Sequence, residues 1–99
     1  MIKNIDIFGT KYTVKEVPEI VDGDYYLFGK ADNKSRQVQI ASTLKGIKQP
    51  ESIKELTLMH EIVHCILMEG QYLSVNQDEP LVEWIARCLI SLKKQGVFK

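Results

Sequence analysis

The chain has 99 residues, and its 13 lysine and arginine residues balance 13 aspartate and glutamate residues. This length suits one domain with a modest core, so we expect a single domain over residues 1–99. The even charge excludes the basic surface that nucleic acid or an anionic membrane requires. No apolar run approaches the ~20 residues that span a bilayer, so we expect no membrane partner.

The first residues, Met1 to Asp6, lack the apolar stretch of a secretion signal. Cys65 and Cys88 both fall within apolar stretches rather than in the loops of a disulfide-rich secreted protein. We therefore expect two free thiols and a cytoplasmic location.

Residues 1–42 read as mainly β. Ile5, Ile7 and the run Tyr12 to Val14 alternate with polar neighbours, which is the pattern of half-buried strands, and Gly9-Thr10 between them predicts a tight hairpin turn. Further strands are predicted at residues 25–29 and 36–42, giving three or four in all. The strand of residues 36–42 is also a candidate edge on which an extended peptide could pair.

After these strands, the spacing of apolar residues changes from the alternation of a strand to the period of a helix. Pro50 suits the first turn of a helix and Gly70 suits the position just past its end, so a helix is predicted over residues 50–69. On a helical wheel one broad apolar arc forms the expected core face; its members are Leu56, Met59, Ile62, Val63, Ile66 and Leu67. His60 and His64 lie side by side just off one edge of that arc.

A loop is expected over residues 70–77, followed by a second helix over residues 78–95. Asp78 is placed to cap this helix, and Gly96 is placed to end it. Glu79 borders the apolar arc of the second helix and Glu83 lies one turn further along the same side.

The stretch His60-Glu61-Ile62-Val63-His64 carries the strongest chemical signal in the chain. Two histidines four residues apart on a helix place their imidazoles on adjacent turns, where both can reach one zinc ion. Zinc lowers the pKa of a bound water to about 7, so the carboxylate of Glu61 can take a proton from it and later deliver one to a leaving amine. The spacing therefore predicts a zinc site that hydrolyses amide bonds.

A catalytic zinc usually has three protein ligands, and no third histidine exists in the chain. Both cysteines are expected in the core, so the third ligand should be Glu79 or Glu83 of the second helix. The position of Glu79 nearer the apolar seam favours it slightly. Glu83 would then accept a hydrogen bond from a ligand histidine, although the reverse assignment is nearly as good.

Residues 58–67, followed by Glu79-Pro80-Leu81-Val82-Glu83-Trp84-Ile85-Ala86, resemble small zincin-type metallopeptidases of bacteriophage and bacterial genomes, a group related to the ImmA/IrrE and SprT-like families. The helical half is similar to gluzincins, in which the second helix supplies a glutamate ligand. The resemblance implies a small twisted antiparallel sheet packed on two main helices, with zinc in a cleft beside an edge strand. It also implies cleavage of a peptide or protein substrate, with Glu61 as the general base.

The chain departs from this pattern in two ways. Pro80 in the first turn of the second helix constrains Glu79, and a chain this short has no added domain to form the far wall of a substrate cleft. A second hypothesis is therefore a zincin-like module that binds metal or a protein partner without turnover, and a third is a metal-free structural protein of a phage particle or regulator.

Overall fold

The computed structural model describes residues 3–98 of the chain. Strands precede helices, as the sequence predicts, and the fold class is α+β. The strands are β1 (Asn4–Ile7), β2 (Thr10–Val17), β3 (Val21–Asp22), β4 (Tyr25–Tyr26), β5 (Gly29–Asp32), β6 (Gln37–Ala41), β7 (Thr43–Leu44) and β8 (Ile47–Lys48). The helices are α1 (Glu51–Glu69), α2 (Leu73–Asn76) and α3 (Glu79–Lys94).

The predicted hairpin between β1 and β2 is present, but its two turn residues are Phe8 and Gly9, one residue earlier than the predicted Gly9-Thr10, and Thr10 begins β2. Both turn residues have positive φ, 50° and 95°, which is the backbone conformation that lets a two-residue turn follow the twist of its strands. The side chain of Asp6 supports the turn by accepting a hydrogen bond from the Gly9 amide at 2.6 Å. Ile7 pairs with Thr10 directly beside it.

The main sheet has four strands in the order β1-β2-β6-β5, and it is mixed, so the expected antiparallel sheet is wrong. β6 pairs with β2 in parallel and with β5 in antiparallel register. The chain leaves β2, turns through β5 and inserts β6 between the two. Alternating apolar residues predict that each of these segments is a strand, but they carry no information on which neighbour it joins.

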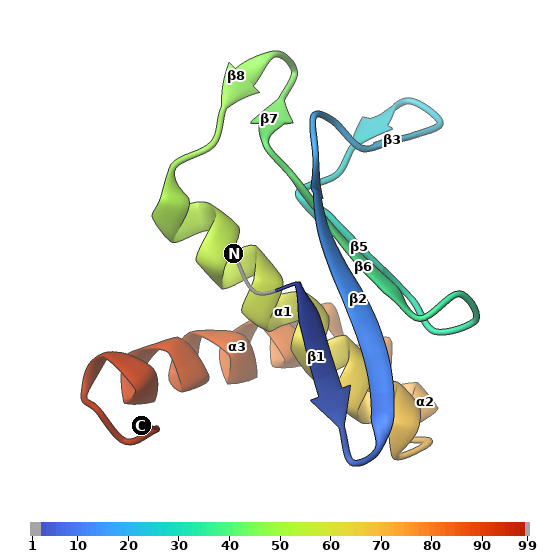
Figure 1. Cartoon of the computed structure of the whole chain (residues 1–99), viewed down its shortest axis with the longest axis vertical. Coiled ribbons are helices and arrows are strands. Elements are labelled where there is room, and N and C mark those ends of the chain that lie inside the picture. The colour runs from blue at the N-terminus through green and yellow to red at the C-terminus, as the bar shows by residue number, and fades with distance from the viewer. Residues whose placement is uncertain (1–2, 99) are drawn as a thin grey trace.

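β6 occupies an interior position in the sheet, so its expected role as an edge strand is also wrong, and β5 forms that edge. The predicted strand of residues 25–29 divides: Tyr25–Tyr26 forms β4, which pairs with β3, and Gly29 begins β5. The small hairpins β3–β4 and β7–β8 both stand at one end of the molecule, beyond the end of the main sheet (Figure 1).

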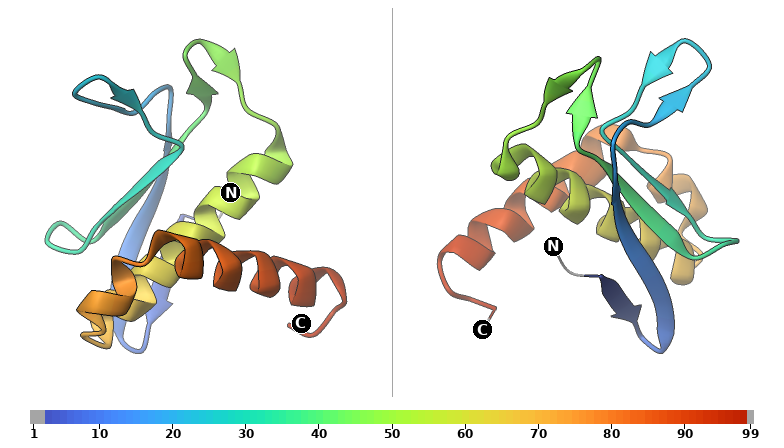
Figure 2. Two further views of the ribbon diagram at one scale, coloured as in Figure 1. Left: turned by 180° about the vertical axis from the view of Figure 1, so that it is seen from behind. Right: turned by 45° about the horizontal axis from the view of Figure 1, so that its top comes forward.

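α1 lies between the sheet and α3, as the view from behind shows (Figure 2). Its contacts with the sheet form one buried cluster: Tyr12, Val14, Val38, Ile40 and Cys65, with Leu58 packed against it. Its contacts with α3 form a second: Val63, Val82 and Ala86, flanked by Leu56, Met59 and Leu67. The expectation of one core face on this helix is therefore wrong, because both sides are covered, and Ile66, assigned to that face, is 46% exposed.

The ends of the two long helices lie within one residue of the predicted limits. α1 starts at Glu51 rather than 50, since Pro50 has extended backbone angles at its N-cap. Asp78 caps α3 as expected, and its side chain accepts a hydrogen bond from the Leu81 amide at 3.2 Å. The expected loop of residues 70–77 contains the short helix α2, which the sequence analysis missed.

Cys65 is buried, Cys88 is half-buried, and both are free thiols. Across residues 3–98, none of the helices combines the length and the apolar composition that crossing a membrane requires.

Candidate metal centre

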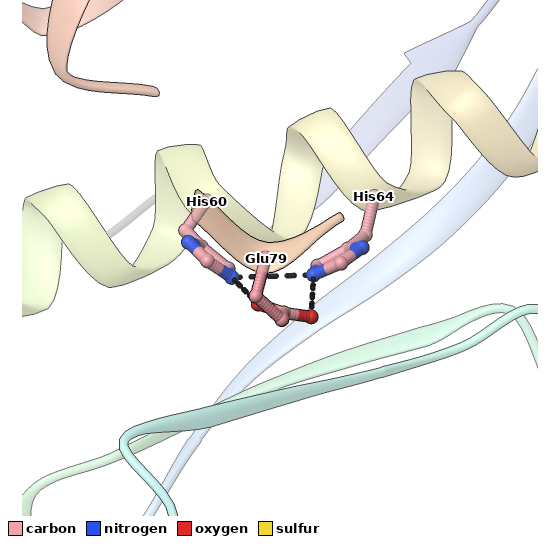
Figure 3. Close-up of side chains that lie close together, drawn as sticks. All are labelled: His60, His64 and Glu79. Carbon is pink, nitrogen blue, oxygen red and sulfur yellow. Dashed lines mark hydrogen bonds and ion pairs between the residues drawn. The ribbon is translucent and has the colours of Figure 1, made fainter. Parts of the chain in front are cut away.

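His60 and His64 project from adjacent turns of α1 toward the same point in space (Figure 3). Their Nε2 atoms lie 3.2 Å apart, and the ring centroids are 4.9 Å apart with the planes inclined at 66°. The helix geometry alone places the two rings as neighbours. What the structure adds is that both rings aim the same nitrogen at one another.

Glu79, the first residue of α3, completes this group. One carboxylate oxygen lies 3.0 Å from His60 Nε2 and the other lies 3.0 Å from His64 Nε2. Asp78 caps the helix at the preceding position, so the start of α3 is fixed where its first side chain meets α1. His60, His64 and Glu79 together form a group whose ligand atoms lie within 4.8 Å of one another.

The opposite nitrogen of each ring also has a partner. His60 Nδ1 lies 2.9 Å from a carboxylate oxygen of Glu83, and His64 Nδ1 lies 2.6 Å from the amide oxygen of Asn76 in α2. Because both partner oxygens only accept hydrogen bonds, each Nδ1 must carry the proton and donate it. A neutral imidazole then has its lone pair on Nε2, the atom that faces Glu79.

This pattern of donors and acceptors fits a bound cation. When both rings are neutral, two Nε2 lone pairs and a carboxylate converge on one region, and three acceptors cannot satisfy one another. Ligand atoms held ~2.0–2.1 Å from a tetrahedral zinc lie roughly 3.3–3.4 Å apart. The two Nε2 atoms here are 3.2 Å apart, and each lies 3.0 Å from a different oxygen of Glu79. Imidazole nitrogens with one carboxylate are also a donor set that zinc prefers.

Glu61 lies between the two histidines in sequence, and its side chain lies next to the sheet. Its side chain borders Gly29 of β5, where an added Cβ would stand only 3.3 Å from Glu61 Cγ. The residue is 8% exposed, and burial raises the pKa of its carboxyl group; Glu79 raises it further, while His60 and His64 oppose the shift. A carboxylate that holds a proton more tightly is a stronger base for a proton-transfer step.

A cleft of about 600 Å³ opens beside these side chains, between α1, α3 and the segment of residues 26–29. His60, Glu61, His64, Glu79 and Glu83 all line it. A smaller cavity of about 190 Å³ lies on the other side of His64 and shares Glu61 and His64 with the cleft. The five residues singled out from the sequence thus surround one solvent-accessible space.

The structure separates the two glutamates that the sequence left as alternatives. Glu79 faces both Nε2 atoms, whereas Glu83 faces only the Nδ1 atom of His60. Asn76 was not foreseen, because residues 70–77 show no helical period and an asparagine in a loop is common. Arg87 was also missed; it forms an ion pair with Glu83 at 2.9 Å and lines the cleft.

Comparison of the chain with family models, curated proteins and solved structures finds no match. The likeness to zincin-type metallopeptidases therefore stays a prediction based on the motif residues. The contacts of Glu79 and Glu83 with the histidines are observed in the structure of this chain.

Proposed function

We propose that this protein is a zinc-dependent metallopeptidase, with His60, His64 and Glu79 as the metal ligands. One observation carries the proposal: two imidazole Nε2 atoms and a carboxylate converge within 4.8 Å, at a cleft that Glu61 also lines. The relation to zincin-like enzymes of phage and bacterial origin is part of the same proposal.

Bound zinc would supply Lewis-acid chemistry, acidifying water and polarising a substrate carbonyl. The residues of the chain divide the remaining tasks. Glu83 and Asn76 hold the protonated Nδ1 atoms and so keep both Nε2 lone pairs directed at the ion. Glu61 takes a proton from water in the cleft and passes it to the nitrogen of the leaving amine.

The substrate we propose is an extended peptide segment. β5 is the edge strand of the sheet, and its first residue, Gly29, lines the cleft with Glu61. The free backbone groups of an edge strand can pair with an added peptide strand, which would hold a peptide bond beside Glu61. Burial of Glu61 on that side restricts water and strengthens the electrostatic interactions there.

The Glu61→Gln substitution tests the catalytic part of this proposal. Glutamine has nearly the same shape but cannot act as a base, so zinc content should match the wild type while peptide cleavage falls about 10²–10⁴-fold. Metal analysis of the purified protein and digestion of a peptide library give the two readouts. Cleavage by the variant at the wild-type rate would remove the general-base role of Glu61.

A second candidate is a zincin-like module that binds metal or a protein partner without turnover. The open wall of the cleft favours it, because Tyr26 and Phe28 on that side are 39% and 49% exposed. Stoichiometric zinc with no cleavage of any peptide in the library would support this candidate. Absence of zinc binding, with melting unchanged by a chelator, would exclude the peptidase and a metal-binding module and support a metal-free structural role.

A further inference from the structure

Arg87 gives one end of the cleft a positive charge. Among the described residues that line the cleft it is the single lysine or arginine. It lies one turn after Glu83 on α3, and its Nη2 is 2.9 Å from Glu83 Oε2. Its side chain is 60% exposed, so the guanidinium group is accessible from the cleft.

The contacts of the two histidines show where Arg87 stands along the cleft. His64 contacts Glu79, whereas His60 contacts both Glu79 and Glu83. α1 and α3 therefore run in opposite directions along the cleft, so the N-terminal part of α1 lies beside the C-terminal part of α3. Leu56 and Ile53 precede His60 in that direction, so they line the same end of the cleft as Arg87.

This end of the cleft combines an apolar lining with the ion pair of Arg87 and Glu83. Phe28 joins Ile53 and Leu56 in lining it, and Phe28 and Ile53 are 49% and 37% exposed. An aliphatic or aromatic side chain of a bound peptide could cover these surfaces and remove them from water. The apolar lining and the guanidinium group together suit a ligand with an apolar side chain next to an anionic group.

Among the described residues that line the cleft, Arg87 is the one that would attract an anionic group. Glu61, Glu79 and Glu83 also line the cleft and would repel a further carboxylate. Arginine carries five N–H donors, and the contact of Nη2 with Glu83 uses part of them, so a guanidinium group that is 60% exposed can bind a second carboxylate at the same time. A planar fork of this kind fits a carboxylate better than it fits an isolated carbonyl oxygen.

We propose that Arg87 is a specificity-determining residue that selects a substrate carboxylate beside an apolar side chain. The carboxylate is either the C-terminal group of a peptide or the side chain of an internal aspartate or glutamate. This inference rests on the proposed peptide substrate and deepens it. It predicts that the cleft prefers peptides with a negative charge on one side of the scissile bond, the side that lies toward the N-terminus of α1.

The test uses the full-length zinc-supplemented Glu61→Gln protein, so that peptides bind without being cut. Fluorescent peptides of one apolar sequence end in a free carboxylate, in an amide, or in an amide preceded by an internal aspartate. Binding is measured by fluorescence anisotropy, and zinc content is measured for every variant. We expect at least one carboxylate peptide to bind roughly five- to tenfold more tightly than the plain amide; which one shows the source of the carboxylate.

Substitution of Arg87 then assigns the preference to this residue. Arg87→Gln should reduce the preference to near one, and Arg87→Lys should keep part of it, because lysine retains the charge but not the fork. Lys94→Gln removes a positive charge from the exposed end of the same helix and serves as the matched control, with the preference retained.

Two outcomes would overturn the inference. Either all three peptides bind with equal affinity or not at all, or Arg87→Gln weakens carboxylate and amide peptides equally while zinc content falls. The second result would mean that Arg87 only holds Glu83 in place. Carboxylate preference in Glu61→Gln alongside a wild-type protein that cleaves nothing would support Arg87 recognition and contradict the peptidase proposal, so the two failures are distinguishable.

Discussion

Asn76 is an uncharged side chain with a defined place in the candidate metal centre. It is the residue that determines which nitrogen of His64 carries the proton, through a hydrogen bond of 2.6 Å. Glu83 does the same for His60 with a full negative charge. The two histidines therefore reach the same tautomer through chemically different partners, one on α2 and one on α3.

Replacing Asn76 by alanine removes the acceptor for His64 Nδ1. We expect zinc affinity to fall about 10–100-fold, since partners of ligand histidines commonly contribute this much. Asn76→Asp should recover most of the loss, because its carboxylate still accepts the hydrogen bond. Competition with a chelating dye measures the affinity. Ser74→Ala on the same short helix is the control, and a wild-type affinity for Asn76→Ala would show that α2 does not orient His64.

Tyr12 supplies a second residue-scale test, away from the metal centre. It is 1% exposed, and its hydroxyl donates a hydrogen bond of 2.6 Å to the Glu69 carboxylate at the end of α1. That bond is the main cause of the lowered pKa of Glu69 in the folded protein, and Thr10 adds to it. A carboxyl group with a lowered pKa stabilises the fold above its unfolded pKa, about 4.3, and this contribution is lost as the pH falls.

Tyr12→Phe should therefore lower the urea midpoint of unfolding at pH 7, with a smaller difference from the wild type near pH 3. Tyr25→Phe, whose residue is 73% exposed, is the matched control and should leave the midpoint unchanged at both pH values. Equal destabilisation by Tyr12→Phe at the two pH values would mean that the Glu69 carboxylate contributes nothing through this bond.

At the scale of elements, the close approach of β5 to α1 shapes the cleft. A Cβ at Gly29 would lie 2.6 Å from Thr57 Cγ2 and 3.1 Å from the backbone oxygen of Gln39. Glycine is therefore required here for space rather than for backbone conformation. The same contact brings the edge strand next to Glu61.

Gly29→Ala should destabilise the protein by about 1–3 kcal/mol, the usual range for overpacking. Thr57→Ser removes the nearest methyl group, so the double variant Gly29→Ala with Thr57→Ser should lose less stability than the two single effects summed. Chemical denaturation of the four proteins measures this coupling. Simple additivity would show that the methyl group of Thr57 does not limit the approach of β5.

The elements also show which parts of the fold can be predicted from the sequence. The two long helices were predicted to within a residue at each end, because a proline, a capping aspartate and a regular apolar period are local signals. The parallel pairing of β2 with β6 and the short helix α2 were not predicted. Both depend on contacts between distant segments, which a local pattern does not encode.

The residues of the candidate site also fall into two groups: those that the sequence predicts from local spacing and those that depend on packing between elements. His60, Glu61 and His64 were identified from one helix, where spacing alone fixes their relation. The choice between Glu79 and Glu83 needed the packing of α3 on α1, since both lie on one side of the same helix. Asn76 and Arg87 were missed because each gains its role from a contact across elements.

For the whole molecule, the candidate centre joins all three helices. α1 contributes the histidines, α3 contributes Glu79 and Glu83, and α2 contributes Asn76. A metal that binds this folded arrangement and not the unfolded chain stabilises the fold by about 2.7 kcal/mol at 100 times its dissociation constant. For a domain of this size that corresponds to a rise in melting temperature on the order of 10–20 °C.

Thermal unfolding with zinc and then with a chelator measures this rise and its reversal. A variant in which both His60 and His64 are alanine is the control and should melt at the same temperature under both conditions. An unchanged melting temperature of the wild-type protein across zinc concentrations would contradict metal binding by the folded form.

Because α1 is packed on both sides, the histidines lie on the element whose backbone amides should exchange with solvent most slowly. The two histidines then separate only when the two clusters come apart, in the global unfolding event. Loss of metal by the folded protein would instead begin at the first turn of α3, where Glu79 is the exposed member of the group.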